Sequence, residues 1–365
     1  MPDLTGAEID LTWPNRWWAA SHGHAATVGE LIAAGADPDH QDGLSGRKPL
    51  HEAASKNHHA VVKVLLEAGV DPLTPVGLTN HAKAGGYENH GSGEPALAYA
   101  CEHGNLEALD TFLPYLDLEA MHSCLAWAAR TGQARVVKHM LSQPDVEVDT
   151  IVRGSTALFK ACLSRDLKTV EALLGAGADP EMLNEVWAEE FRSAATSKKP
   201  SGSHAQFTCL HALCGLPGLS HRNDDWDESD CYEIATLLIN AGADVKRQTE
   251  DGKTGLHHIV EVSYYLARLL MEAGASTGAV DSKGRTPLYY SLVPACIPLL
   301  VEQGGADVNV KDVYGDTPLL VALADHYNEV KVQLLLECGA DAGVLNSAGD
   351  STLHVALENY ATPVS

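Results

Sequence analysis

A leucine that recurs at a nearly constant spacing is the feature that most limits how this chain can fold. Leu256, Leu288, Leu319 and Leu353 follow one another in steps of 32, 31 and 34 residues, and each closes a similar phrase: GKTGL, GRTPL, GDTPL or GDSTL. A fixed period near 33 is typical of an array of small repeats, in which each repeat packs only on its neighbours. We therefore expect one core that extends along a stack of repeats, and not two or three separate globular domains.

The stretch from Gly315 to Gly349 shows what one repeat contains. It has two short helical patterns, a Gly-Ala-Asp stop and a polar arm that leads to the next Gly-Asp. Thr at the start can cap the first helix, and Pro is tolerated in the first helical turn. The apolar run VQLLL faces a neighbouring unit, and Gly follows the second helix, where a left-handed backbone suits glycine. Each repeat is thus predicted to be a pair of short helices.

The lettering T-P-L-H-x-A at this period resembles the ankyrin-repeat family. The segment from Gly46 to Val76, GRKPLHEAASKNHHAVVKVLLEAGVD and its following arm, matches the family pattern closely. The resemblance implies an all-α ankyrin-repeat solenoid of about ten repeats, of which the first and the last are atypical. The first has Trp17 and Trp18 where a small residue and His are usual. The last stops after one helix, which favours a truncated piece of a longer protein over a terminal cap.

The period also predicts the domain organisation. An irregular N-terminal segment, 1–14, precedes the array, which covers 15–365. Three loop insertions, 77–93, 185–206 and 215–230, interrupt the repeats. The first is rich in Gly, Asn and His and cannot be helical throughout. Long insertions without periodicity are more often functional than simple connections are.

Charge and cysteine content exclude several classes of function. Lys and Arg number 25 against 49 Asp and Glu, which gives a net charge of −24. Binding to nucleic acid or to an anionic membrane surface needs clustered Lys and Arg, so neither is expected, whereas cationic partners are favoured. The eight cysteines form no CxxC pair, which favours the reducing cytoplasm or nucleus. The sequence contains no run of 18 apolar residues, so no membrane span is predicted.

The resemblance also assigns a candidate binding site. In ankyrin repeats the first helices line a concave groove, and the second, fifth and sixth residues after the anchor leucine point into it. Aromatic residues and Arg are favoured at binding hot spots. On this assignment, replacing Trp127 or Arg130 by Ala should leave stability nearly unchanged; the alternative is that such positions are simply solvated. The candidate partner-binding residues are Trp18, His22, Glu52, Lys56, Tyr99, Glu102, His103, Trp127, Arg130 and Lys160.

No metal site, cofactor site or catalytic motif is predicted. His51, His211, His257 and His354 occupy the histidine slot of T-P-L-H, which in the family forms hydrogen bonds between adjacent loops. The acidic run 223–230 lacks the Gly turn and the terminal Glu of an EF-hand calcium loop. No GxSxG, HExxH or P-loop motif is present.

Three functions follow from these observations. The leading one is a protein–protein interaction module, a scaffold or adaptor, that binds a protein or peptide segment, with a basic segment favoured by charge. A second is the regulatory or sensor ankyrin region of a larger protein. A third is an enzyme that acts on a small molecule in a groove pocket closed by the insertions; it would show an enclosed titratable group with a shifted pKa. Because no reaction motif is present, the interaction module is favoured.

Overall fold

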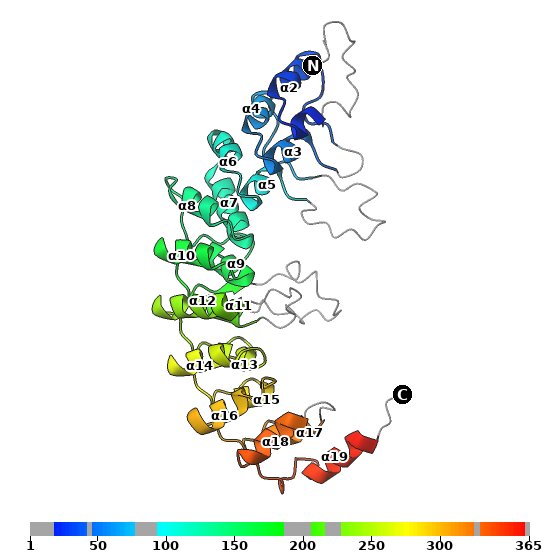
Figure 1. Ribbon diagram of the computed structural model, residues 1–365, viewed down its shortest axis with the longest axis vertical. Helices are drawn as coiled ribbons and strands as arrows, with labels where there is room; N and C mark the ends of the chain where they lie inside the picture. Colours follow the sequence, from blue (N-terminus) through cyan, green and yellow to red (C-terminus); the bar gives the residue numbers. More distant parts are fainter. Residues whose placement is uncertain are drawn as a thin grey trace. The chain divides into compact units, whose positions relative to one another are not determined.

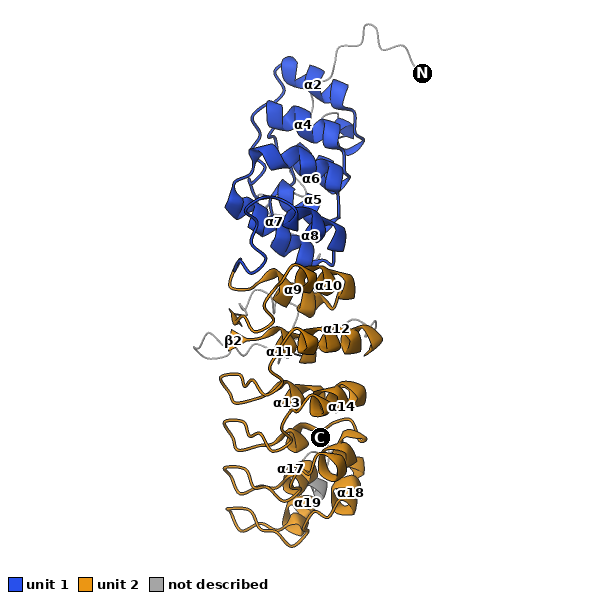
Figure 2. Cartoon of the chain, turned by 90° about the vertical axis from the view of Figure 1, so that its left-hand side faces the viewer, with its two compact units in different colours: residues 1–152 blue, residues 153–365 orange. Residues whose placement is uncertain are grey.

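The computed structural model describes residues 18–41, 46–76, 93–185, 206–215, 228–324 and 329–361. These fall into two compact units, unit 1 in residues 1–152 and unit 2 in residues 153–365 (Figure 2). The predicted N-terminal segment and most of the three predicted insertions lie outside the described residues.

Unit 1 consists of short helices arranged in consecutive pairs. A helical turn at residues 18–21 pairs with the first labelled helix. The helices of this unit are α2 (Ala25–Ala33), α3 (Pro49–Ser55), α4 (His59–Glu67), α5 (Ala96–Glu102), α6 (Leu106–Phe112) with the 3-10 turn η1 (Leu113–Tyr115), α7 (Leu118–Arg130) and α8 (Ala134–Leu141) (Figure 1).

Unit 2 continues the same alternation, and the chain ends on a single helix. Its helices are α9 (Ala157–Ser164), α10 (Leu167–Gly175), α11 (Cys209–Cys214), α12 (Glu228–Asn240), α13 (Gly255–Ile259), α14 (Tyr264–Glu272), α15 (Pro287–Tyr290), α16 (Cys296–Pro298) with the π-helical turn η2 (Leu299–Gln303), α17 (Pro318–Ala324), α18 (Glu329–Glu337) and α19 (Thr352–Ala361).

The mostly helical fold confirms the predicted class, and two details differ from the sequence-based boundaries. A two-stranded antiparallel sheet, β1 (Asn184–Glu185) with β2 (Gln206–Phe207), pairs the two ends of the second insertion and was not predicted. Helix α12 begins at residue 228, inside the range given to the third insertion.

Helices pack in two layers within each unit. In unit 1 the first helices α3, α5 and α7 pack in sequence, and α4 packs on α6 in the second layer. In unit 2 the first helices run from α9 through α11, α13, α15 and α17 to α19, while α10, α12 and α14 form the second layer, followed by α16 on α18. Within each unit, these helices thus cover the apolar face of the helix at the same position in the preceding repeat.

The anchor leucines explain why the period predicts the fold. Leu256, Leu288 and Leu319 are at most 1% exposed, at the centre of the packed first helices. Burying a leucine side chain contributes roughly 1.5–3 kcal/mol, so every period adds a similar increment of core. Leu353 occupies the same position in α19 but is 73% exposed, because no further helix pair covers it in the described structure.

The predicted bonding of the loop histidines is confirmed for His211 and His257. In each, Nδ1 accepts the N–H of the helix-capping threonine, and Nε2 donates to the carbonyl of the next loop, at 3.1 Å to Arg247 and 3.2 Å to Arg285. An imidazole ring with one accepting nitrogen and one donating nitrogen is neutral, because both nitrogens donate in the protonated ring. Burial accordingly lowers the pKa of His211 to about 4.

Tyr289 fills this histidine slot in α15. Its hydroxyl lies 2.6 Å from the carbonyl oxygen of Val310 and 2.7 Å from that of Asp316, both in the next loop. The inter-loop connection is therefore retained although the residue differs.

Candidate partner-binding surfaces

The first helices of unit 1 place an arginine over a tyrosine. The guanidinium carbon of Arg47, in the loop before α3, lies 4.8 Å from the centroid of the Tyr99 ring on α5. His51 contacts the same ring edge-on, with centroids 5.7 Å apart. Burial raises the pKa of the Tyr99 hydroxyl, so it is protonated at neutral pH. The tyrosine is thus enclosed by cationic and aromatic groups from two repeats.

Glu52 connects the cations of this surface. Its Oε1 accepts a hydrogen bond from Arg47 at 3.0 Å, and its Oε2 lies 3.8 Å from the ammonium of Lys56, one helical turn further along α3. The carboxylate is buried, while the Lys56 side chain is about half exposed. A buried carboxylate therefore positions two basic side chains whose ends reach solvent.

A second ion-pair group lies on α5 and α7. Arg130 donates to Glu102 and lies 3.9 Å from Glu94. The carbonyl of Glu102 also accepts a 2.8 Å hydrogen bond from Gln133. The Arg130 side chain is 47% exposed, and both carboxylates lie beneath it. As in the first group, the cation faces solvent and the anions are the more buried partners.

Aromatic rings and imidazoles accompany these charges. Trp18 is 51% exposed and stacks on His22 with ring centroids 4.3 Å apart. His103 stacks on Tyr99 at 6.2 Å, and its Nδ1 lies 2.8 Å from the Tyr99 carbonyl oxygen. Both His22 and His103 are exposed. They offer a flat surface and a hydrogen-bonding nitrogen to a partner.

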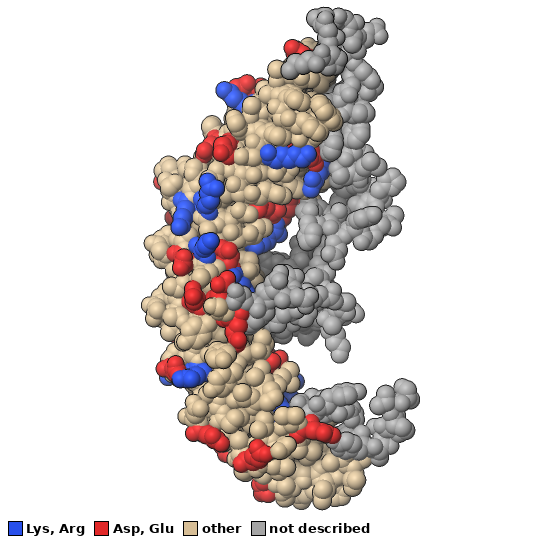
Figure 3. Space-filling model, in the orientation of Figure 1, with Lys and Arg blue, Asp and Glu red and all other residues tan. Residues whose placement is uncertain are grey.

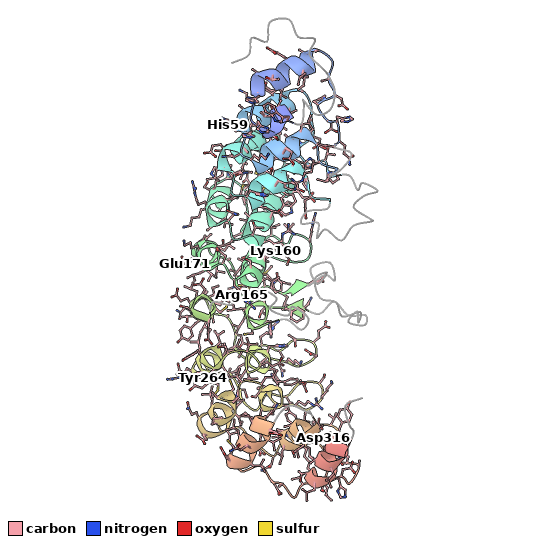
Figure 4. The ribbon with its side chains drawn as sticks, turned by 45° about the vertical axis from the view of Figure 1, so that its right-hand side comes forward. His59, Lys160, Arg165, Glu171, Tyr264 and Asp316 are labelled. Carbon is pink, nitrogen blue, oxygen red and sulfur yellow. The ribbon has the colours of Figure 1, made fainter. Side chains whose placement is uncertain are left out.

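Besides Glu52, which is 5% exposed, three predicted site residues are less accessible than the sequence suggested. Tyr99 is 4% exposed and Trp127 is 9% exposed, so both rings are largely enclosed. The burial of Trp127 reverses the expectation that Trp127→Ala leaves stability unchanged, because removing the ring would leave a cavity. Lys160 belongs to unit 2, is buried, and donates to Ser155. Figure 4 places Lys160 in the first-helix layer of that unit, whereas Glu171 and Tyr264 mark the second-helix layer.

Sequence reasoning missed Arg47 and Glu94. Each follows the loop glycine and precedes its anchor leucine by three residues, at Leu50 and Leu97. The register used for prediction included only positions after the leucine. A charged residue next to each loop glycine was the available signal, since Lys253, Arg285 and Asp316 occupy the same place.

Unit 2 contains a small recess among its own first helices. Its volume is about 170 Å³, and its walls are Glu261, Tyr289, Tyr290, Leu292, Val321, Ala322 and Lys331. They come from α15, α17 and α18 and from the turn that follows α13. None of these seven residues is among the candidates predicted from the sequence.

A shortened helix accounts for this recess. Helix α15 ends at Tyr290, the backbone of Ser291 is extended, and Pro294 has no N–H with which to continue the helix. The N–H of Val293, which a continuing helix would direct to the Tyr289 carbonyl, lies instead 3.3 Å from the carbonyl oxygen of Val260. Lys331 reaches in from α18 and donates to the Tyr289 carbonyl at 2.7 Å. A side-chain donor thus replaces the missing helical turn, and space remains beside it.

On the face drawn in Figure 3, Lys and Arg side chains lie among Asp and Glu side chains. No group of three or more His, Cys, Asp or Glu in the described ranges is arranged to hold a metal ion. Within the same ranges no helix combines the length and the apolar character needed to cross a bilayer.

Comparisons with known proteins agree with this geometry. The family model for ankyrin repeats in three copies matches residues 17–122 and 228–312, and the single ankyrin-repeat model matches residues 153–185. Together these matches include both units, and the first model alone covers more than half of the chain.

Curated relatives share the repeats over part of their length. Neurogenic locus notch homolog protein 1 of Danio rerio is 29% identical over 148 residues, which is 39% of this chain and 6% of that protein. The E3 ubiquitin-protein ligase KEG of Arabidopsis thaliana is 24% identical over 307 residues, 73% of this chain and 18% of the ligase. SH3 and multiple ankyrin repeat domains protein 2 of Homo sapiens is 34% identical over 132 residues, 34% of this chain and 7% of that protein. The chain therefore spans less than a fifth of the length of each of these relatives.

Among solved structures, the human ASB11 ankyrin repeat domain aligns with a TM-score of 0.49 and 23% identity, over 71% of this chain and 97% of the other. The helix pairs, the loop histidines and the family-model matches lead to one assignment. The chain belongs to the ankyrin-repeat family.

Proposed function

We propose that this chain is a scaffold or adaptor that binds a protein or peptide segment across the first helices of unit 1. The observation that carries the proposal is the arrangement of Arg47, Lys56 and Arg130. Each pairs with a carboxylate more buried than itself, and the side chains of Arg47, Lys56 and Arg130 are 33%, 45% and 47% exposed. A cation fixed in this way loses little side-chain entropy when a partner binds. An arginine that already donates to one carboxylate still has N–H groups that can donate to a second acceptor.

The chemistry of this surface refines the expected partner. The net charge of −24 attracts basic segments at long range. At contact, however, the first helices of unit 1 present three part-exposed cations and, in the first repeat, the stacked rings of Trp18 and His22. The proposed segment therefore has acidic or hydrogen-bond-accepting side chains near the three cations and an apolar side chain near Trp18.

A peptide display selection tests this proposal. A random peptide library is selected on the intact chain, and the affinity of the recovered peptides is measured for the intact chain and for a Lys56→Ala/Arg130→Ala variant. We expect the variant to lose at least tenfold in affinity, which corresponds to about 1.4 kcal/mol.

The matched control is Lys63→Ala/Arg135→Ala, which removes two cations from the second-helix layer of the same unit. This control should bind the selected peptides normally. Peptides that bind the Lys56→Ala/Arg130→Ala variant as tightly as the intact chain would place the binding surface elsewhere.

We also propose a location in the cytoplasm or nucleus. The eight cysteines are all free thiols, and all except Cys338 are buried, which is the usual state in a reducing compartment. Fluorescence imaging of a tagged chain, with compartment markers, tests this location. A role as the regulatory region of a larger protein stays a prediction.

A further inference from the structure

We propose that the recess in unit 2 is a second binding site and that it receives a basic side chain, lysine or arginine, from a bound peptide. The proposal extends the interaction function proposed above to unit 2 and to a different ligand chemistry. Neither the repeat pattern nor the family comparison assigns a ligand to this recess.

Glu261 is the group that would recognise the ligand. Glu261 lines the recess and is exposed to solvent. Its carboxylate makes no hydrogen bond or ion pair to any residue in the described ranges. Burial raises the pKa of its carboxyl group because it disfavours the charged form, while the nearby ammonium groups of Lys253 and Lys331 act in the opposite direction. A cation that enters the recess would give the carboxylate the direct charge-assisted hydrogen bond that neither lysine supplies.

Lys331 contributes differently to the recess. It is 6% exposed, and its ammonium donates to the Tyr289 carbonyl that the interrupted helix leaves without its usual donor. This lysine therefore has a structural role in closing the end of α15. The ammonium groups of Lys331 and Lys253 are engaged by the Tyr289 carbonyl and by the Tyr290 ring, so the Glu261 carboxylate is the recess group that a cationic guest would contact.

The remaining walls fit the stem of a long basic side chain. Leu292 is exposed at the recess, and Val321 and Ala322 line it from α17. A volume of about 170 Å³ is of the order of one side chain. Methylene groups of lysine or arginine can pack on such apolar walls while the charged end reaches Glu261. The overall charge of −24 further favours a cationic guest.

The face of Tyr290 is already occupied by a cation. The Lys253 ammonium lies 4.4 Å from the centroid of its ring, and the Tyr290 hydroxyl donates to Asp281 at 2.5 Å. Both contacts fix the ring in place. The guest is therefore expected to be recognised through the carboxylate and the aliphatic walls, and not by stacking on this ring.

A site-directed tethering experiment tests the proposal without a known partner. Leu292→Cys is introduced in a Cys338→Ser background, because the other cysteines are buried. The protein is equilibrated with a mixture of small disulfides that carry 2-aminoethyl, 2-guanidinoethyl, propyl or 2-carboxyethyl groups, and intact mass spectrometry reports which group is attached.

We expect the ammonium or guanidinium group to be attached about tenfold more than the propyl group at Leu292→Cys. Which of the two cations is preferred distinguishes lysine from arginine. Adding Glu261→Gln should remove the preference, whereas Glu302→Gln, an equal change of charge at an exposed position outside the recess, should keep it. Val280→Cys, at another exposed position of unit 2, reports the background attraction of the acidic chain.

Equal attachment of cationic and propyl groups, or a cation preference that survives Glu261→Gln, would overturn the proposal. Preferred attachment of the carboxyethyl group would also overturn it and would assign the recess to an anion. Because tethering reports only on unit 2, its failure is distinguishable from failure of the peptide selection, which reports on unit 1.

Discussion

The Arg47 guanidinium lies 4.8 Å from the centroid of the Tyr99 ring, and the two residues come from consecutive repeats. The same relationship recurs in unit 2, where the Lys253 ammonium lies 4.4 Å from the Tyr290 ring. In both cases the cation follows a loop glycine, and the ring lies two residues after the anchor leucine of the next repeat. Such a cation–π contact contributes about 0.5–2 kcal/mol and connects the loop of one repeat to the helix of the next.

Loss of an anchor leucine should destabilise the array according to its burial. Leu319→Ala is expected to lower the free energy of unfolding by about 2–5 kcal/mol, because the side chain is 1% exposed and its loss leaves a cavity. Leu353→Ala removes the same group at the same repeat position where it is 73% exposed, and should cost less than about 0.5 kcal/mol. Urea titration followed by circular dichroism measures both. Equal losses for the two variants would contradict the repeat register.

Trp127 and Arg130 should have separate effects although both belong to α7. Trp127→Ala is expected to cost about 3–5 kcal/mol, because the ring is enclosed. Arg130→Ala should change stability by no more than about 1 kcal/mol, because the ion pairs are near the surface. Thermal unfolding of each variant, combined with its affinity for selected peptides, separates a packing residue from a binding residue. A Trp127→Ala variant that unfolds like the intact chain would show that the ring is not part of the core.

Stability should fall as the pH is lowered from about 6.5 toward 4. His51 and His211 each have a folded-state pKa of about 4 against 6.5 in the unfolded chain, because burial disfavours their charged form. The unfolded state then binds more protons than the folded state within this window, so each histidine contributes up to about 3 kcal/mol above pH 6.5 that is lost by pH 4.

The control for this effect is His211→Gln, which does not titrate. The variant is expected to be less stable than the intact chain at pH 7, because Gln cannot make both ring contacts. The difference between the two proteins should become smaller at pH 4.5. Denaturant midpoints at pH 7.0, 5.5 and 4.5 report this, and a difference that does not depend on pH would show that His211 is protonated equally in both states.

Two glycines should respond in opposite directions to alanine. Gly304→Ala places a methyl group 2.5 Å from Thr277 Cγ2 and 2.7 Å from Met271 Cε, and should destabilise by about 1–3 kcal/mol. Gly175→Ala, at the end of α10, meets no heavy atom within 4 Å, and its backbone is helical. It should stabilise by about 0.4–1 kcal/mol by restricting the unfolded chain. Differential scanning calorimetry of the two variants checks both signs, and destabilisation by Gly175→Ala would show that its surroundings are tighter than described.

The repeat fold was predictable because its cause is periodic. Leu288 and Leu319 are buried in the same way, so one spacing in the sequence identifies the same position in each repeat. The inter-loop role of His211 and His257 was also predictable, since it follows from a local motif. The pairing of Asn184 with Phe207 was not, because it joins residues that are separated by an insertion without periodicity.

The candidate surface was predictable only in part. Trp18, Lys56 and Arg130 are exposed as expected, and their role in binding stays a prediction. The contribution of Arg47 depends on a contact between repeats that no position rule within one repeat contains. For the same reason the burial of Trp127 could not be read from its place on the helix.

By itself, the sequence determined the family, the alternation of first and second helices, and the residues that anchor each repeat, since these follow from local periodicity and capping. Only the tertiary structure decided which charges reach solvent and where a recess remains. Those outcomes depend on neighbours supplied by other repeats. Helix α15 ends at Tyr290, and Lys331 of α18 donates to the Tyr289 carbonyl. The recess beside Glu261 lies where these two elements meet.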